Sequence, residues 1–421
     1  MSSEIKNEIT NMGSKALNAS RALANLSSSE KNNILLAMAD GILSDADKII
    51  EANNIDLENA EQNNLTSSMI DRLGLDQKRV EAIADGIRQV ATLPDPVGEV
   101  MDEWNRPNGI MIKQIRVPIG VIGIIYESRP NVTSDAAVLC LKTGNATILR
   151  GGKESINSNI AISDSLQRAG ESAGLPENSI QLIPFTDRES VKHLAEMDEY
   201  LDLIIPRGGA GLIEAVVSMA RMPVIKHYDG ICHTYVDDEC DLDMAKNIVI
   251  DAKTQKPSVC NALETLLVSE KVASTFLPMI GKELNDKQVE IRADDRSREL
   301  LGVNCVDATT EDWTTEYLDL IVSVKVVDDV YEAINHINHY GSHHSDCIIT
   351  NSKETADEFL NRIDSATVFW NVSTRFSDGE EFGFGAEIGI STDKLHARGP
   401  MALRELTSYK YLISGNGQTK A

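Results

Sequence analysis

Residues 121–126 form a continuous apolar run, Val-Ile-Gly-Ile-Ile-Tyr, with no polar residue at alternate positions. A strand with one face in water alternates apolar and polar side chains, whereas a strand buried on both faces does not. Strands buried on both faces occur mainly in parallel sheets that helices cover on either side. This run therefore predicts an α/β fold and requires the neighbouring chain to supply the covering helices.

The chain after this run alternates helical and strand patterns. Helices are expected at 133–142, 155–173, 189–197 and 212–220, and strands at 146–149, 180–185, 201–205 and 224–227. Alternation at this spacing predicts a doubly wound, mainly parallel sheet of the Rossmann type. A second series follows His233, with helices at 243–253, 272–284 and 353–362 and strands at 263–268, 320–326, 347–350 and 366–370. It predicts a second α/β domain.

The segment before residue 121 has a different organisation. Residues 5–92 are predicted to be helical, and Ser27 with Glu30 forms a capping-box pattern at the start of one helix. Residues 104–116 surround a Pro-Asn-Gly turn and predict a β-hairpin. The residues alone leave open whether this hairpin contacts another subunit or is an ordinary surface hairpin.

Acidic residues outnumber basic residues by 65 to 40, and the formal net charge is −25. Such a chain is a poor partner for nucleic acid, whose phosphates need a basic surface. No apolar run reaches the roughly 18 residues that cross a bilayer, and residues 1–18 carry no signal pattern. We therefore predict a cytoplasmic protein without a membrane partner. A phosphate-bearing ligand would need local cations or backbone N–H groups.

Two glycine-rich turns follow predicted strands and could supply those groups. The candidate residues are Arg150, Gly151, Gly152, Lys153 and Ser155 in the first turn and Arg207, Gly208 and Gly209 in the second. Backbone N–H groups between a strand and a helix, together with cations, suit phosphate. Ligands in open α/β sheets bind at the carboxyl ends of the strands, so two turns on neighbouring strand ends favour a cofactor site. Each turn taken alone could also be a plain connection.

Cys260 is the candidate nucleophile among six cysteines whose spacing suggests no disulfide. It lies in a loop between a predicted helix and a predicted strand, where an accessible thiolate could attack a carbonyl carbon. The alternative is a semi-buried structural cysteine, which the apolar helix around Cys140 fits well. A further cluster, His336, His339, His343, His344, Asp346 and Cys347, matches no recognised metal motif. We predict no metal.

Several segments together resemble one known family. They are residues 117–133 (Val-Pro-Ile-Gly-Val-Ile-Gly-Ile-Ile-Tyr-Glu-Ser-Arg-Pro-Asn-Val-Thr), the turn at 150–155, the Cys260 loop, residues 340–346, residues 384–389 and residues 396–400. This set is similar to the γ-glutamyl phosphate reductases, a branch of the aldehyde dehydrogenase superfamily. The resemblance runs from about residue 8 to residue 413 in order.

The resemblance implies an aldehyde-dehydrogenase-like fold with three parts. A Rossmann-type cofactor-binding domain is expected at 1–100 and 118–232, and an α/β catalytic domain at 233–395. A small β oligomerisation element is expected at 101–117 and 396–421. The family pattern also implies a homo-oligomer, a dimer or a tetramer.

The resemblance also implies a reaction. NADPH reduces L-glutamyl 5-phosphate to L-glutamate 5-semialdehyde and phosphate, the second step of proline biosynthesis. The Cys260 thiolate forms a thioester, and the Asn131 amide holds the oxyanion together with the backbone N–H of Cys260. Glu316 falls where the superfamily places the glutamate that holds the nicotinamide ribose.

Two departures from hydrolytic aldehyde dehydrogenases favour the reductase. Those enzymes carry a glutamate base upstream of the cysteine, where this chain has Lys-His-Tyr-Asp-Gly at 226–230, with Asp229 as a possible stand-in. Lys153 falls near the position of their NAD-preferring glutamate, and a cation there favours a 2′-phosphate. The alternatives are a hydrolytic semialdehyde dehydrogenase and a catalytically silent oligomeric binding protein.

The residues that hold the α-amino and α-carboxylate groups of the substrate are not evident from the sequence. Arg398 and Lys256 are candidates for an anionic group, although either could be a surface cation. No kinase-length segment precedes Met1, so we expect a stand-alone reductase. A transient contact with glutamate 5-kinase is left open. The glycine-rich segment 383–389 is interpreted as a cleft-lining or mobile loop.

Overall fold

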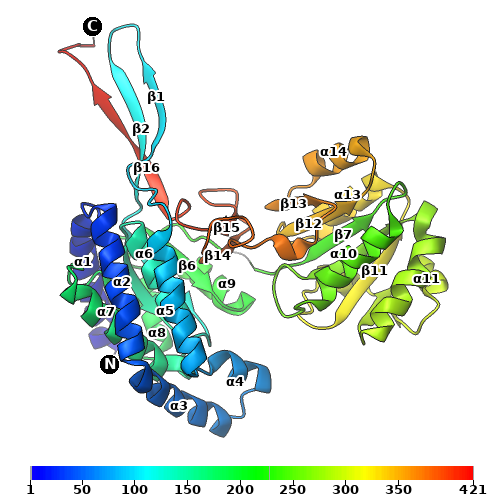
Figure 1. Cartoon of the computed structure of the whole chain (residues 1–421), viewed down its shortest axis with the longest axis horizontal. Coiled ribbons are helices and arrows are strands. Elements are labelled where there is room, and N and C mark those ends of the chain that lie inside the picture. Colours follow the sequence, from blue (N-terminus) through cyan, green and yellow to red (C-terminus); the bar gives the residue numbers. More distant parts are fainter. Residues whose placement is uncertain (1, 227, 421) are drawn as a thin grey trace. The chain divides into compact units, whose positions relative to one another are not determined.

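The computed structural model describes residues 2–226 and 228–420, which form two compact units (Figure 1). Unit 1 comprises Met1–Lys226, Gly383–Gly389 and Met401–Ala421, and unit 2 comprises His227–Phe382 and Ile390–Pro400. The first division falls before the predicted boundary at 232, because the strand that starts at Cys232 belongs to the sheet of unit 2. His227, the last residue of a predicted strand, lies outside the described residues.

The sheet of unit 1 has four parallel strands in the order β5-β4-β3-β6. They are β3 (Val121–Tyr126), β4 (Ala146–Arg150), β5 (Ile180–Leu182) and β6 (Leu203–Arg207). All six residues of β3 are buried, so the apolar run is confirmed as a strand covered on both faces. The strand predicted at 224–227 was wrong in extent, because residues 224–226 add only the single bridge between Val224 and Ile204.

Nine helices of the described chain surround this sheet. They are α1 (Ser2–Leu23), α2 (Ser28–Ser44), α3 (Ala46–Gln62), α4 (Ser67–Leu73), α5 (Gln77–Thr92), α6 (Asn131–Lys142), α7 (Ile156–Ser172), α8 (Arg188–Ala195) and α9 (Ala210–Met219). The predicted capping box begins α2: the Ser27 hydroxyl accepts from the Glu30 N–H (3.3 Å), and the Ser27 N–H donates to the Glu30 carboxylate (2.8 Å). Helix α2 packs against α5 and α7 (Figure 1).

The start of α7 is capped by a residue of another helix. Ser155, which precedes α7, makes no side-chain cap bond, and the buried Asp56 of α3 takes that place. Its Oδ2 accepts from the Ser158 N–H at 2.8 Å and from the Ser158 hydroxyl at 2.5 Å. Its Oδ1 accepts from the Asn157 side-chain amide at 2.8 Å. A carboxylate at a helix N-terminus satisfies N–H groups that have no partner within the helix.

We therefore expect Asp56→Ala to lower the free energy of unfolding by about 2 kcal/mol, since it removes a cap and leaves buried donors unsatisfied. Urea unfolding followed by circular dichroism measures this change. Glu58→Ala, an exposed position of the same helix, is the matched control and should change stability by less than about 0.5 kcal/mol. Equal effects of the two substitutions would show that the cap contributes nothing.

Unit 2 contains a seven-stranded parallel sheet in the order β10-β9-β11-β8-β7-β12-β13. The strands are β7 (Cys232–Val236), β8 (Leu263–Ser269), β9 (Glu290–Ala293), β10 (Val306–Asp307), β11 (Ile321–Val327), β12 (Ser345–Ile349) and β13 (Thr367–Trp370). The helices are α10 (Leu242–Thr254), α11 (Glu270–Asp286), α12 (Asp295–Leu301), α13 (Val330–Tyr340) and α14 (Lys353–Arg362). Sequence patterns missed β7, β9 and β10, because β9 and β10 are short and β7 mixes polar with apolar residues.

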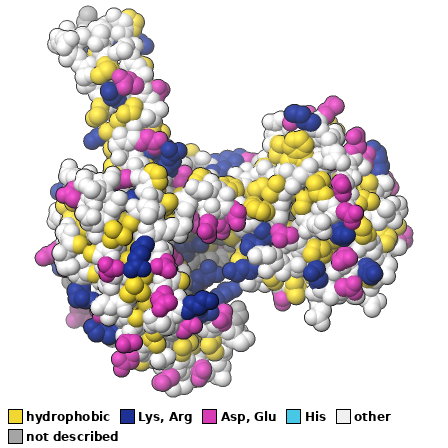
Figure 2. Space-filling view, viewed as in Figure 1, with side chains coloured by type: hydrophobic (Ala, Val, Ile, Leu, Met, Phe, Trp, Pro, Cys, Tyr) yellow, Lys and Arg dark blue, Asp and Glu magenta, His cyan; other side chains and the backbone are white. Residues whose placement is uncertain are grey.

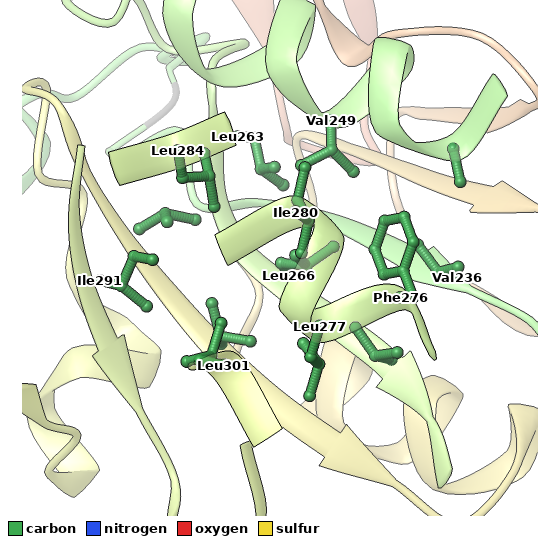
Figure 3. Packing of buried hydrophobic residues seen from close by; sticks show 14 of the residues in the cluster. Val236, Val249, Leu263, Leu266, Phe276, Leu277, Ile280, Leu284, Ile291 and Leu301 are labelled. Carbon is green, nitrogen blue, oxygen red and sulfur yellow. The ribbon is translucent and has the colours of Figure 1, made fainter. Parts of the chain in front are cut away.

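Both faces of this sheet are covered by apolar packing. On one face, Phe276 and Ile280 of α11 pack with Leu266 of β8 (Figure 3). A second cluster joins Tyr235 of β7 with Phe359 of α14. Two separate cores on one parallel sheet are the mark of a doubly wound domain, so the predicted α/β fold class is confirmed for this unit.

A separate three-stranded antiparallel sheet belongs to unit 1. It pairs β1 (Val100–Asn105) with β2 (Met111–Pro118), and β2 with β16 (Thr407–Ser414) (Figure 1). The predicted hairpin and the last strand of the chain thus form one sheet. A short two-stranded sheet pairs β14 (Gly389–Ser391) with β15 (Gly399–Met401). Every helix of residues 2–226 and 228–420 is too short or too polar to cross a lipid bilayer.

Candidate active site

Cys260 lies in unit 2, in the loop between α10 and β8, and is half-buried. Two neighbours hold its backbone. The Cys232 thiol at the start of β7 donates to the Cys260 carbonyl oxygen at 3.2 Å. The preceding Gly230 packs so closely that a Cβ atom there would lie 1.9 Å from the same oxygen. The start of β7 and the glycine just before it therefore fix the position of the cysteine backbone.

The other five cysteines are poor nucleophiles. Burial raises the pKa of Cys140 and of Cys347 to about 12 and that of Cys240 to about 11, and it also raises the pKa of Cys232 and Cys305 above the ordinary value. A thiol reacts through its thiolate, so a raised pKa makes each of these five groups a weaker nucleophile than a free cysteine.

Glu316 lies in the same unit and meets the turn beside the cysteine loop. Its Oε1 accepts from the Gly230 N–H at 3.0 Å. Burial raises the pKa of Glu316, and the charge of the neighbouring Asp229 raises it further. The structure therefore brings Glu316, Gly230 and Cys260 together, although they are far apart in the sequence. Asp229, the possible stand-in base, belongs to the same turn.

The histidine cluster is only partly buried in unit 2: His336, His344, Asp346 and Cys347 are buried, His343 is half-buried and His339 is exposed. The buried His233 bonds to Asp346 at 3.0 Å, and the His336 ring packs against the rings of Trp313 and Tyr340. Burial lowers the pKa of His336 to about 2. Within the described residues, no group of three His, Cys, Asp or Glu side chains is placed to hold a metal ion.

The two glycine-rich turns lie in unit 1 at the ends of β4 and β6. The sequence analysis expected these two strands to be neighbours, which is wrong because β3 lies between them. The first turn and the start of α9, which follows the second turn, nevertheless border one cavity of about 690 Å³, whereas Arg207, Gly208 and Gly209 are not among its lining residues. The first turn contributes Arg150, Gly152 and Lys153 to its wall, and the start of α9 contributes Gly211 and Leu212. This is the edge of the sheet where ligands of open α/β folds bind.

The first turn is built by close contacts. The Arg150 guanidinium donates to the carbonyl oxygens of Gly151 (3.0 Å) and Thr186 (2.9 Å), and burial lowers the pKa of Arg150. A Cβ atom on Gly151 would lie 2.1 Å from the side-chain nitrogen of Asn159. Ser155 is fully buried and accepts from that same nitrogen at 3.0 Å. The Ser155 side chain therefore points into the protein. The Arg150 side chain joins the first turn to the loop that contains Thr186.

The second turn contacts a carboxylate that sequence reasoning missed. Glu127, directly after β3, accepts from the Gly209 N–H at 3.0 Å, and a Cβ atom on Gly208 would lie 2.4 Å from the same oxygen. Arg207 faces the segment 383–389, since a Cβ atom on Gly389 would lie 1.8 Å from its guanidinium. That segment packs within unit 1. The N–H group of Gly209 is thus already hydrogen-bonded.

Two further cations of the cavity wall were also missed. Arg188 and Lys192 of α8 line it together with Lys153. On the face shown in Figure 2, acidic side chains are interspersed with basic ones, as the composition requires. Neither Lys153 nor Arg188, however, forms an ion pair in the described part of the chain. The sequence did offer a signal for these two cations. They follow the predicted strand at 180–185, whose carboxyl end lies at the same edge of the sheet as the other strand ends.

Asn131 is the first residue of α6 in unit 1 and is exposed. Its side-chain N–H₂ group donates one hydrogen bond to Asp135, four residues later, at 2.8 Å. Burial raises the pKa of Asp135 to about 6. The bond orients the amide and leaves its second N–H for another acceptor.

The chain has many relatives of known family. The model of the aldehyde dehydrogenase family matches residues 2–299. The γ-glutamyl phosphate reductase of Clostridium botulinum (strain Alaska E43 / Type E3) is 55% identical, covering 98% of this chain and all of its own length. That of Moorella thermoacetica is 55% identical over 98% of this chain and 99% of its own. The crystal structure of the Thermotoga maritima γ-glutamyl phosphate reductase superposes with a TM-score of 0.97 at 46% identity, over 98% of this chain and 100% of that one.

Proposed function

Because this chain belongs to the γ-glutamyl phosphate reductases of the aldehyde dehydrogenase family, we propose that it reduces L-glutamyl 5-phosphate to L-glutamate 5-semialdehyde and phosphate. The reaction is the second step of proline biosynthesis and uses NADPH. The observation that carries the proposal is the Cys260 loop. It holds a half-buried cysteine whose backbone is fixed by the Cys232 thiol and by the close approach of Gly230.

The chemistry follows from the cysteine. Its thiolate attacks the acyl carbon of the substrate, the carbon–oxygen bond to phosphate breaks, and phosphate leaves with that electron pair to give a thioester on Cys260. When bound, NADPH supplies the hydride that reduces this thioester. Breaking of the carbon–sulfur bond releases the aldehyde and returns the thiolate. We assign Asn131 the role of oxyanion donor, because the bond to Asp135 orients its amide.

The cavity of unit 1 fits part of a dinucleotide. Its volume of about 690 Å³ lies in the range of cofactor sites. Lys153 and Arg188 are cations without a carboxylate partner in the described chain, which suits the 2′-phosphate that distinguishes NADPH from NADH. We propose that Gly151 and Gly152 let the backbone approach the cofactor. Glu316, in unit 2, is proposed to hold the nicotinamide ribose.

The other predicted cofactor residues take supporting roles in this proposal. Arg150 and Ser155 shape the first turn through the bonds described above, and Arg207 supports the segment 383–389. Gly208 and Gly209 present the start of α9, where Glu127 occupies the Gly209 N–H in the structure.

Phosphate dependence separates this function from hydrolytic dehydrogenation. Purified protein receives glutamate 5-semialdehyde and NADP⁺, with and without inorganic phosphate, and NADPH formation is followed by absorbance. The proposal expects turnover only with phosphate, because phosphate must cleave the thioester in this direction. Equal turnover without phosphate would assign the chain to the hydrolytic enzymes, with Asp229 as the first candidate base.

Cofactor choice gives a second expected result. Lys153→Ala and Arg188→Ala should each raise the Kd for NADPH by about 10-fold and change the Kd for NADH by less than about 2-fold, because only NADPH carries the 2′-phosphate. Titration of cofactor fluorescence measures both constants. Lys78→Ala, an exposed lysine of α5, is the control. A parallel loss of NADH binding would mean that the cavity holds another part of the cofactor.

The partners are proposals of the same kind. Strand β16 exposes Tyr409, Tyr411 and Ile413 by 51%, 51% and 66%, which is unusual for apolar strand residues. We propose that a second copy of the chain covers the sheet β1-β2-β16 in a dimer or tetramer. A transient contact with glutamate 5-kinase would shorten the time that the acyl phosphate spends in water.

A further inference from the structure

The arginines of unit 2 differ in their partners. Five of the six form ion pairs with carboxylates: Arg292 with Glu290 and Asp312, Arg296 with Glu270 and Asp328, Arg298 with Asp295 and Asp307, Arg362 with Glu358, and Arg398 with Asp364. Arg375 alone forms none in the described part of the chain. Within unit 2, an arginine without a carboxylate partner is therefore the exception.

Arg375 belongs to a short 3-10 helix, Thr374–Phe376, that is joined to the cysteine loop. Asn261, the residue after Cys260, donates its side-chain amide to the carbonyl oxygens of Ser377 (3.0 Å) and Arg375 (3.3 Å). The buried Thr374 hydroxyl donates to the Asn261 carbonyl oxygen at 2.8 Å. These three bonds fix the backbone of Arg375 relative to the cysteine.

The guanidinium group of Arg375 is itself oriented. Its Nε donates to the side-chain oxygen of Gln255, at the other end of the cysteine loop, at 2.9 Å. This neutral partner uses one of five N–H groups and leaves both terminal nitrogens available. The side chain is half-buried, so its charge is neither neutralised by a carboxylate nor fully exposed. A guanidinium group in this state can bind a carboxylate by donating two parallel hydrogen bonds to its oxygens.

We propose that Arg375 binds the α-carboxylate of the substrate, an inference that rests on the proposed function. The phosphate of L-glutamyl 5-phosphate leaves during the reaction, whereas the α-carboxylate is present in both substrate and product. It is separated from the reacting carbon by the length of the glutamyl chain. Its receptor therefore has to lie beside the cysteine loop, where Arg375 is held, and not at the cysteine itself.

The two candidates from the sequence fit this role less well. Arg398 is held by Asp364, whose carboxylate it contacts at 2.9 Å, so its charge is already paired. Lys256 is exposed on the cysteine loop and offers a single point charge on a flexible stem. Arg375 combines an unpaired fork with a fixed backbone.

The test compares two aldehydes in the phosphate-dependent reverse reaction. Glutamate 5-semialdehyde carries the α-carboxylate, and 4-aminobutanal is the same molecule without it. The wild-type protein is expected to prefer the first by about 30-fold in kcat/KM, the range of a charged bidentate contact. Arg375→Met should remove this preference by raising the KM for the semialdehyde, while the KM for phosphate and NADP⁺ stays within about 2-fold.

Arg375→Lys should keep part of the preference, and Arg362→Met, which removes a paired surface arginine of α14, should leave all constants unchanged. A variant that loses kcat equally for both aldehydes would assign Arg375 a purely structural role and overturn the proposal. A rise in the KM for phosphate would assign it to the phosphate and overturn it as well. Wild-type turnover that needs no phosphate would refute the proposed function instead, whatever the variant does.

Discussion

Cys260→Ala is expected to reduce phosphate-dependent NADPH formation by at least about 10,000-fold, because the covalent thioester cannot form without the thiol. The alanine side chain is smaller than the thiol and is accommodated in a half-buried loop. The fold and the cavity of unit 1 should therefore be unchanged. Titration with NADPH is expected to give a Kd within about 2-fold of the wild-type value.

Cys305→Ala is the matched control for this experiment. Cys305 is a half-buried thiol of the same unit, and burial raises its pKa above the ordinary value. We expect its replacement to leave turnover within about 2-fold of wild type. Full activity of the Cys260 variant would exclude the thioester mechanism. Loss of activity in both variants would indicate a general sensitivity of unit 2 and not a nucleophile.

Gly230→Ala is expected to lower kcat by about 100-fold through the position of the cysteine, since a misplacement of roughly 1 Å can have this effect. A methyl group at residue 230 would lie 1.9 Å from the carbonyl oxygen of Cys260 and 2.5 Å from its carbonyl carbon. Because these are backbone atoms, no side-chain rotation relieves the contact. The loop or the turn has to move, and the bond from the Gly230 N–H to Glu316 moves with it.

The reactivity of the thiol separates displacement from unfolding. The rate of Cys260 alkylation by iodoacetamide should change in the Gly230 variant, while its far-UV circular dichroism spectrum stays that of the wild type. Gly86→Ala is the control, because a Cβ atom at that position in α5 would meet nothing within 4 Å apart from its chain neighbours and the helix's own backbone. It should keep full activity and raise the stability by about 0.5–1 kcal/mol. Unchanged turnover in the Gly230 variant would show that the loop tolerates displacement.

Local patterns predicted much of the fold. The apolar run at 121–126 and the capping box at Ser27 were found where the sequence placed them. The capping box depends on contacts between residues close in the chain. The buried strand can be predicted because the pattern of apolar residues along the chain indicates burial directly. The strand at Cys232–Val236 was missed because it mixes polar with apolar residues, and the buried His233 ring bonds to Asp346. No local pattern records such a partner.

The sequence by itself determined the fold class and the family, and it supplied Cys260 as the proposed nucleophile, because these rest on the order of residues along the chain. The tertiary structure decided which side chains share a site. Glu316 meets the Gly230 turn across 86 residues, and Arg375 reaches Gln255 across 120. The tertiary structure also decided which predicted residues already have a partner. Ser155 is hydrogen-bonded to Asn159, and Arg398 forms an ion pair with Asp364. Hydrogen bonds and ion pairs act over a few ångströms in space, and the distance along the chain does not limit which residues they join.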